Sequence, residues 1–232
     1  MAKKKLFRFA EMQTFNNVVH ATADDVLNKK HPLHGRWAEK VFGSAMPVVL
    51  ELGCGKGEYT TGLAELFPKL NFLGIDVKGA RIWKGAKYAN ENKLGNAGFL
   101  RTRIDFISSF FAPGEIDQIW ITFPDPQLKK ARKRLTSSVF LNRYREFLKA
   151  GGLVHLKTDN LELYQYTLSV IKTNGLELLE ATDNLYGSDQ AGSVLSIKTY
   201  YEQRYLDKGM PITYLKFRID SQDVITEPEA VI

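Results

Sequence analysis

Cysteine is nearly absent from this sequence: Cys54 is the single example among 232 residues. One thiol excludes a disulfide within the chain and a zinc site built from several cysteines. The apolar runs all fall short of the roughly 18 residues that a membrane-spanning helix needs. The N-terminus, residues 1–8, is basic but lacks the apolar core of a secretory signal. We therefore expect a cytoplasmic protein without a membrane partner.

The familiar glycine patterns of nucleotide-binding loops are also missing. The stretch from Glu51 to Gly57 spaces its glycines as G-x-G-x-G, whereas dinucleotide-binding folds use G-x-G-x-x-G. It is not a P-loop, because glycine follows Lys56 where serine or threonine is required. The stretch lies between an apolar run and a helical pattern, so it predicts a glycine turn at the carboxyl edge of a parallel sheet, where such sheets bind ligands. Glu51 suits an ammonium group or hydroxyls better than a pyrophosphate. A strand–helix turn without a ligand is the alternative.

From residue 47 onward, strand and helix patterns alternate, which predicts βαβ units and a mostly parallel sheet. The expected strands are 48–51, 71–77, 99–104, 116–123 and 153–158, and the expected helices are 59–67, 80–93, 139–148 and 161–173. Gly151 and Gly152 are expected to end the helix at 139–148. Two late strands, 176–181 and 212–219, flank a short helix at 200–207 and predict one antiparallel strand. The prediction is an α/β protein with seven strands and helices on both faces.

The chain divides into three expected parts. Residues 1–46 show no alternating strand pattern and predict a basic arm with one or two short helices. Residues 47–220 form the α/β domain. Residues 221–232 are rich in acids and predict a solvated tail.

The net charge is +6 and the isoelectric point is near 9.2, which favours a polyanionic partner. Basic residues crowd one segment: Lys129, Lys130, Arg132, Lys133, Arg134, Arg143 and Arg145. Because the run at 129–134 contains no aromatic residue, it predicts contacts to phosphates rather than stacking on bases. A solvated surface is the alternative.

Acidic residues follow successive strands of the predicted sheet: Glu51, Asp76, Asp105, Asp125 and Asp159. Parallel strands end at one edge, where these carboxylates would repel one another unless ligands or cations separated them. Asp76 is placed to accept two ribose hydroxyls, and Asp105 is placed to accept from an adenine amino group. The alternatives are a strand-end turn for Asp76 and a helix cap for Asp105.

Asp125 lies between Pro124 and Pro126, which hold it on a stiff, extended backbone. The basic run follows directly. This combination favours a catalytic acid beside an anionic substrate over a rigid turn without a function.

Five motifs occur together: Glu51-Leu52-Gly53-Cys54-Gly55, Gly74-Ile75-Asp76-Val77, Phe123-Pro124-Asp125-Pro126, Leu156-Lys157-Thr158-Asp159 and Thr199-Tyr200-Tyr201-Glu202. In order and spacing, over roughly residues 45–218, they resemble the bacterial tRNA (guanine-N7)-methyltransferase family. The resemblance implies a Rossmann-like class I methyltransferase fold. It also implies methyl transfer from S-adenosylmethionine to N7 of guanine 46 in the variable loop of tRNA, with S-adenosylhomocysteine as product and no metal. Either a monomer or a homodimer is compatible with it.

The resemblance also assigns roles to individual residues. The cofactor would be lined by Glu51, Gly53, Gly55, Asp76, Asp105 and Asp125, with Asp125 as the catalytic acid. The target nucleotide would be contacted by Lys129, Asp159, Thr199, Tyr200, Tyr201 and Glu202. RNA would be contacted by Lys130, Arg132, Lys133 and Arg134. The sequence departs from the family pattern in three places: Asp76 replaces the usual Glu, Gln127 replaces the usual Trp, and the basic run is shorter and lacks a histidine.

The chemistry of the implied reaction fits these residues. Guanine N7 carries an in-plane lone pair and no proton, so it needs no general base. Positive charge develops on the purine, and a fixed Asp125 carboxylate would stabilise it. Asp159 and Glu202 could accept hydrogen bonds from guanine N1 and N2. The alternatives are a methyltransferase for a small molecule or a protein, a tRNA-binding module without catalysis and, less favoured, a nicotinamide dehydrogenase.

Overall fold

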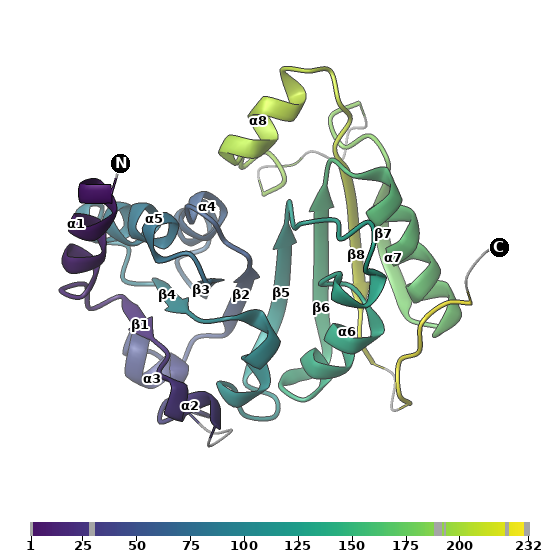
Figure 1. The fold of residues 1–232 in the computed structure, drawn as a ribbon. Helices are drawn as coiled ribbons and strands as arrows, with labels where there is room; N and C mark the ends of the chain where they lie inside the picture. The colour runs from purple at the N-terminus through teal and green to yellow at the C-terminus, as the bar shows by residue number, and fades with distance from the viewer. Residues whose placement is uncertain (1, 28–30, 188–191, 193, 221–222, 230–232) are drawn as a thin grey trace.

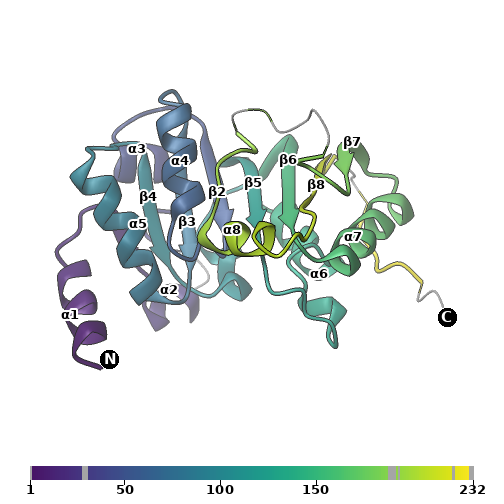
Figure 2. The same cartoon turned by 90° about the horizontal axis from the view of Figure 1, so that it is seen from above.

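The structure is a computed structural model that describes residues 2–27, 31–187, 192, 194–220 and 223–229. Its centre is an eight-stranded sheet in the order β1-β4-β3-β2-β5-β6-β8-β7. The strands are β1 (Val18–His20), β2 (Val48–Leu52), β3 (Asn71–Asp76), β4 (Ala97–Arg101), β5 (Ile116–Thr122), β6 (Leu148–Thr158), β7 (Glu177–Thr182) and β8 (Thr213–Arg218). In Figure 2 the strands follow one another from β4 to β7 in a single row.

The helices are α1 (Ala2–Met12), α2 (Ala23–Leu27), α3 (Trp37–Phe42), α4 (Glu58–Leu66), α5 (Gly79–Glu91), α6 (Ser138–Arg145), α7 (Leu161–Thr173) and α8 (Tyr200–Leu206), with the short 3-10 segments η1 (Ile104–Ser109) and η2 (Ala131–Lys133). Figure 1 shows this arrangement. In the described part of the chain, every helix is too short or too polar to cross a membrane.

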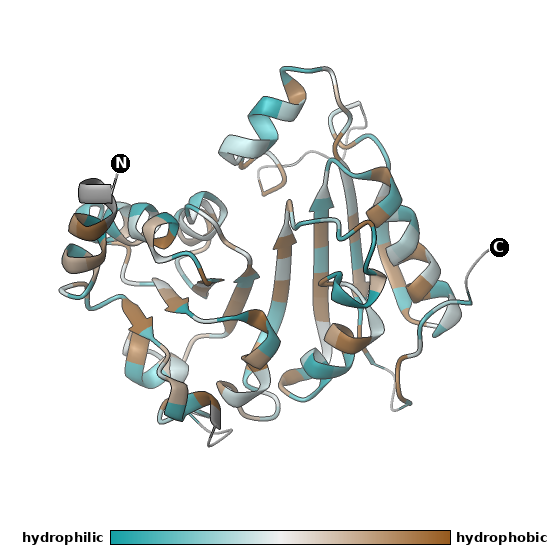
Figure 3. Cartoon of the chain, in the orientation of Figure 1, coloured by the Kyte–Doolittle hydropathy of each residue, from teal (hydrophilic) through white to brown (hydrophobic). Residues whose placement is uncertain are grey.

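The central strands are buried on both faces, and their alternate residues enter two different hydrophobic cores. Leu50 on β2 packs in one core with Leu141 of α6, whereas Val49 packs in the other with Leu63 of α4. All five residues of β2 are buried, as a parallel strand covered by helices on both sides requires. Figure 3 shows the hydrophobic character of the inner strands. The predicted mostly parallel sheet with helices on both faces is confirmed.

The predicted antiparallel strand near the C-terminus is also confirmed, because β8 pairs antiparallel with both β6 and β7. The predicted number of strands is wrong by one. Residues 18–20 in the N-terminal arm form β1, which pairs parallel with β4 at the edge of the sheet. This three-residue strand is defined by its pairing with β4, and it is too short to show a period of its own.

The predicted helix stop at Gly151 and Gly152 is wrong. Helix α6 ends at Arg145, and β6 has already begun at Leu148. The register of β6 against β5 shifts between Leu148 and Leu153, and Gly151 adopts a φ of 71° within that irregular stretch. The glycines therefore belong to a bulge in a strand rather than to the end of a helix.

The predicted acidic tail is solvated only in part where the structure describes it, over residues 223–229: Asp223, Val224, Thr226 and Glu229 are exposed, whereas Ile225 and Glu227 pack against the domain. Ile225 is 2% exposed, and its backbone N–H and carbonyl both bond to the Asn142 side chain, at 3.0 and 2.7 Å. Glu227 accepts hydrogen bonds from the backbone N–H of Ser138 at 2.9 Å and from the Tyr166 hydroxyl at 2.6 Å. The tail thus packs across α6 and α7, and Glu227 satisfies an N–H in the first turn of α6.

Replacing Ile225 with alanine should lower the free energy of unfolding by about 2 to 4 kcal/mol, because a buried aliphatic side chain leaves a cavity. Urea denaturation measures this difference. The control is Val224→Ala, since Val224 is 73% exposed and its loss should cost less than about 0.5 kcal/mol. Equal effects of the two substitutions would show that the tail contributes no packing.

Candidate functional site

The carboxyl ends of the central strands border a cleft of about 600 Å³. It receives residues from the turn after β2, from the ends of β3 and β5 and from the segment after β4. Among the residues along it are Gly53, Asp76, Asp105, Phe123, Asp125 and Lys133. Three of the five predicted strand-end acids therefore meet in one cleft, as the parallel topology requires.

The glycine turn after β2 presents bare backbone. Gly53 and Gly55 have φ values of 77° and 56°, which residues with a side chain rarely adopt. A Cβ built on Gly53 would meet no atom within 4 Å, and one on Gly55 would meet only the Gly53 carbonyl at 3.9 Å. The space beside these residues is therefore open to a ligand that approaches the main chain.

Asp76 links this turn to the end of β3. Its carboxylate accepts hydrogen bonds from the backbone N–H of Gly55 at 3.0 Å and of Lys78 at 2.7 Å. Each oxygen uses one acceptor position in this way and retains another, so the group can still accept from two neighbouring hydroxyls. Asp76 can therefore stabilise the turn at the end of its strand and still accept hydrogen bonds from ribose hydroxyls.

Glu51 is placed differently from the expectation that it faces the ligand. It is 3% exposed and is not among the described residues that line the cleft. Its carboxylate accepts from the Thr60 backbone N–H at 2.8 Å, from the Thr60 hydroxyl and from the Thr122 hydroxyl at 2.6 Å. Burial raises the pKa of Glu51 to about 7, although these hydrogen bonds oppose the shift. Glu51 therefore joins β2, β5 and the first turn of α4 beneath the glycine turn.

Asp105 and Asp125 are both exposed. Asp105 lies 3.2 Å from Arg103 in an ion pair, and Arg103 rather than Asp105 is the N-cap of η1. The helix-cap alternative for Asp105 is therefore wrong. Asp125 accepts from the backbone N–H of Gln127 at 3.1 Å.

The loop that carries Asp125 has an unusual backbone. Phe123 and Gln127, on either side of the two prolines, both have a φ of 48°. Such values are costly for residues with a side chain, and they persist when the surroundings determine the conformation. The loop therefore presents Asp125 to the cleft in a fixed position.

The basic run divides into two groups. Lys129, Lys130, Arg132 and Lys133 are exposed, and Lys133 also lines the cleft. Arg134 is 4% exposed, so the expectation that it contacts RNA is not met in this structure. Its guanidinium donates to the Pro126 carbonyl at 3.0 Å, pairs with Glu162 and lies 4.4 Å from the centre of the Tyr166 ring. Arg134 thereby anchors the loop of Asp125 to α7.

Helix α8 lies beyond the carboxyl ends of β5 and β6 (Figure 1). Thr199 and Glu202 form a capping box at its N-terminus, so both residues serve the helix itself. Tyr200 is 49% exposed, and the Lys56 ammonium lies 3.4 Å from the centre of its ring. Tyr201 is half-buried, with the Arg81 guanidinium 5.8 Å from its ring centre. Arg81 lines the cleft, so α8 borders it.

Of the remaining predicted residues, Asp159 is half-buried at the end of β6, and burial raises its pKa. Glu202 is completely buried and is paired with Lys157, which lies in the motif Leu156-Lys157-Thr158-Asp159 but has no role predicted from the sequence. The sequence does contain a signal for such a buried pair, because Lys157 lies inside a predicted apolar strand, at the end of the run from Leu153 to Lys157.

Comparison with known proteins shows which sequences this chain is similar to. Residues 45–215 match the protein family described as "Putative methyltransferase". The tRNA (guanine-N(7)-)-methyltransferase of Bacteroides thetaiotaomicron is 47% identical over 100% of this chain and 92% of its own length. The enzyme of the same name from Christiangramia forsetii is 46% identical over 94% of this chain and 99% of its own length.

Solved structures show the same fold at low sequence identity. The 16S rRNA methyltransferase KamB aligns with a TM-score of 0.59 and 16% identity over 75% of this chain and 88% of its own. A SAM-dependent methyltransferase from Aquifex aeolicus aligns with a TM-score of 0.52 and 14% identity, over 86% of this chain and 99% of its own.

The raised pKa of Glu51 makes a prediction about stability and pH. The folded protein holds the proton of Glu51 more tightly than the unfolded chain does, so folding loses this contribution as the pH rises from about 4.5 to about 7. Replacing Glu51 with glutamine should therefore become more favourable with rising pH, by up to about 3 kcal/mol between pH 5 and pH 8. Urea denaturation at each pH measures the difference from the unsubstituted protein. Glu146→Gln, at an exposed position, is the control, and a Glu51→Gln difference that stays constant with pH would refute the assignment.

Proposed function

The chain belongs to the family of tRNA (guanine-N(7)-)-methyltransferases, and we propose that the cleft at the carboxyl edge of its sheet is where methyl transfer to guanine 46 takes place. The activity is the S-adenosylmethionine-dependent methylation of guanine N7 in tRNA. The proposal concerns which residues carry it out, and it places the protein in the cytoplasm.

The cleft fits S-adenosylmethionine in its chemistry. Open backbone at Gly53 and Gly55 allows close approach, and Asp76 retains acceptor positions for the ribose hydroxyls. Asp105, exposed after β4, is the proposed acceptor for the adenine amino group. When bound, S-adenosylmethionine supplies a methyl group on a positively charged sulfur. Glu51 is proposed to support the glycine turn from beneath, through its hydrogen bonds to Thr60 and Thr122.

Asp125 is the proposed catalytic acid. Guanine N7 has no proton to lose, so the protein must orient the base and stabilise the positive charge that develops on it. A carboxylate held between two prolines can do this without reorganising during the reaction. The observation that carries the proposal is that Asp125 and Lys133 line the same cleft, so one loop presents both the acid and a cation for the RNA backbone.

The surface around this loop is proposed to bind the tRNA. Lys129, Lys130, Arg132 and Lys133 are exposed and have no anchoring role comparable to that of Arg134. Asp159 after β6 and Tyr200 and Tyr201 on α8 are the proposed contacts of the target nucleotide. To reach them, the guanine must leave its stack, as bases do in enzymes that modify them.

Replacing Asp125 with asparagine should lower kcat/KM for tRNA by roughly 100- to 1000-fold, because the side chain keeps its shape but loses its charge. Transfer of label from S-adenosylmethionine to unmodified tRNA measures the rate, and calorimetry measures binding of the donor, which should be retained. The control is Asp24→Asn, at an exposed position on α2. Full turnover by the Asp125 variant would remove the catalytic assignment.

Reversing the charges of Lys130, Arg132 and Lys133 to glutamate should flatten the dependence of tRNA binding on salt. Each lost phosphate contact lowers the slope of log K against log salt by about 0.7 to 0.9, so three contacts change it by roughly 2 to 3. Filter binding at several salt concentrations measures the slope. Reversing Lys69, Lys93 and Lys172, which are exposed in turns or helix ends at the opposite edge of the sheet, is the control. An unchanged slope would mean that the basic run is only a solvated surface.

A further inference from the structure

The ion pair between Lys157 and Glu202 is buried at the point where α8 meets the sheet. The Lys157 Nζ lies 2.7 Å from the Glu202 Oε1, and both side chains are 0% exposed. Removing two charges from water is costly, and such pairs contribute little net stability compared with apolar residues. This pair therefore calls for an explanation other than stability.

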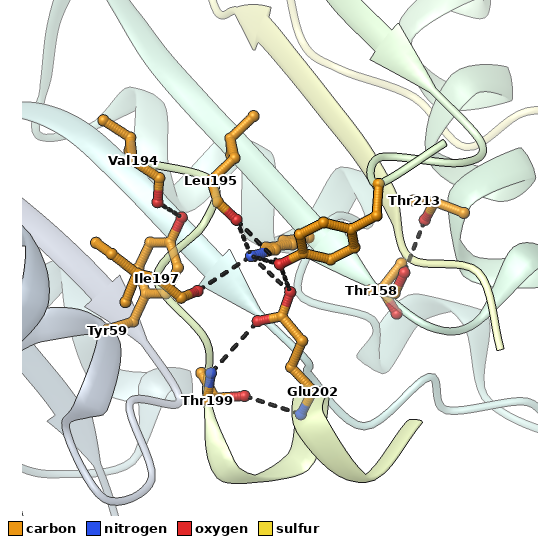
Figure 4. A network of polar contacts seen from close by, with 10 residues as sticks. Tyr59, Thr158, Val194, Leu195, Ile197, Thr199, Glu202 and Thr213 are labelled. Carbon is orange, nitrogen blue, oxygen red and sulfur yellow. Dashed lines mark hydrogen bonds and ion pairs between the residues drawn. The ribbon is translucent and has the colours of Figure 1, made fainter. Parts of the chain in front are cut away.

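Both members of the pair use nearly all of their hydrogen-bonding capacity (Figure 4). Lys157 donates to the carbonyls of Leu195 at 2.6 Å and Ile197 at 3.2 Å. Glu202 accepts from the Tyr186 hydroxyl at 2.6 Å and, through Oε2, from the Thr199 backbone N–H at 3.3 Å. Lys157 thus holds the segment before α8 by its carbonyls and α8 itself by its third residue.

This arrangement is hard to reconcile with Glu202 as a reader of guanine. To accept from guanine N1 and N2, its carboxylate would have to become exposed and release Lys157 and Tyr186. That would leave the Lys157 ammonium buried without its counter-charge, which typically costs several kcal/mol. Asp159 is half-buried at the end of the same strand as Lys157, and no ion pair has to be broken to free its carboxylate for a base.

The ion pair between Lys157 and Glu202 instead positions α8 at the rim of the cleft. The backbone N–H of Tyr200 donates to Glu58 at 2.9 Å, which joins the start of α8 to the start of α4. At the other end of α8, the Tyr205 ring stacks on Phe123 with centroids 6.1 Å apart. Phe123 precedes Pro124 and Asp125, so the placement of α8 is coupled to the loop that carries Asp125.

We propose that Lys157 is a positioning residue, which acts through Glu202 to hold α8 over the cleft, and that Glu202 itself does not read the guanine. This proposal rests on the proposed function, because α8 borders the nucleotide site only if the cleft is the site of transfer. Selection of guanine over adenine then belongs to Asp159 and the cleft, while Lys157 and Glu202 set the position of Tyr200, Tyr201 and Tyr205.

The test compares Lys157→Met, Glu202→Gln and Tyr186→Phe in the full chain, with Lys172→Met as the matched control. Lys172 is an exposed lysine at the far end of α7, so its replacement removes the same charge without touching α8. Tyr186→Phe removes a single hydroxyl and keeps the proposal testable if Lys157→Met does not fold. The measurements are steady-state tRNA methylation, calorimetry with S-adenosylmethionine, hydrogen exchange of the amides at 199–206, and identification of the methylated nucleoside.

We expect Lys157→Met and Glu202→Gln to share one phenotype. kcat/KM for tRNA should fall by about 100-fold, as displaced positioning groups can cause, while binding of S-adenosylmethionine is unchanged. Amides 199–206 should exchange faster while the strands stay protected, and 7-methylguanosine should remain the product. Tyr186→Phe should show a weaker form of the same changes.

Two results would overturn the proposal. One is a Glu202→Gln enzyme that methylates tRNA carrying adenine at the target position while Lys157→Met does not, because Glu202 would then read the base. The other is unchanged exchange at 199–206 in all three variants. Failure of the proposed function is a separate outcome: the unsubstituted protein would not methylate tRNA, and the exchange experiment would still decide whether Lys157 holds α8.

Discussion

Burying a carboxylate requires a complete set of hydrogen-bonding partners, and this requirement shapes the carboxyl edge of the sheet. Glu51 meets it with Thr60 and Thr122, and Glu202 meets it with Lys157, Tyr186 and the backbone of Thr199. In each case the partners come from elements far apart in the chain. The two buried acids therefore hold α4 and α8 at defined positions around the cleft.

The acids that line the cleft are available for a different task. Asp76, Asp105 and Asp125 line the cleft and accept few hydrogen bonds from the protein, so they retain acceptor positions for ligands. Glu51 and Glu202 thus organise the edge, while the acids that line the cleft face the proposed donor and base. The same division applies to the cations, since Arg134 is buried as an anchor and Lys133 is exposed at the cleft.

The loop of Asp125 is supported from the C-terminal end of the chain. Glu227 bonds to the Tyr166 hydroxyl, the Tyr166 ring lies against the Arg134 guanidinium, and Arg134 bonds to the Pro126 carbonyl. A continuous set of contacts therefore joins the tail, α7 and the residue next to Asp125. The tail packs as part of the domain and supports the backbone that carries Asp125, the proposed catalytic acid.

Periodicity and local backbone chemistry were sufficient to predict the alternating strands and helices, the glycine turn after β2 and the meeting of Asp76, Asp105 and Asp125 at one edge. These features follow from the sequence because strand ends and turns depend on neighbouring residues, and parallel strands bring their ends together. The sequence did not predict β1, because this short strand is defined by its pairing with β4 and not by a pattern of its own. The burial of Glu51, Arg134, Glu202 and Ile225 was decided only by the tertiary structure. Whether a charged or apolar side chain is buried depends on the partners that distant segments bring to it, and no local pattern contains that information.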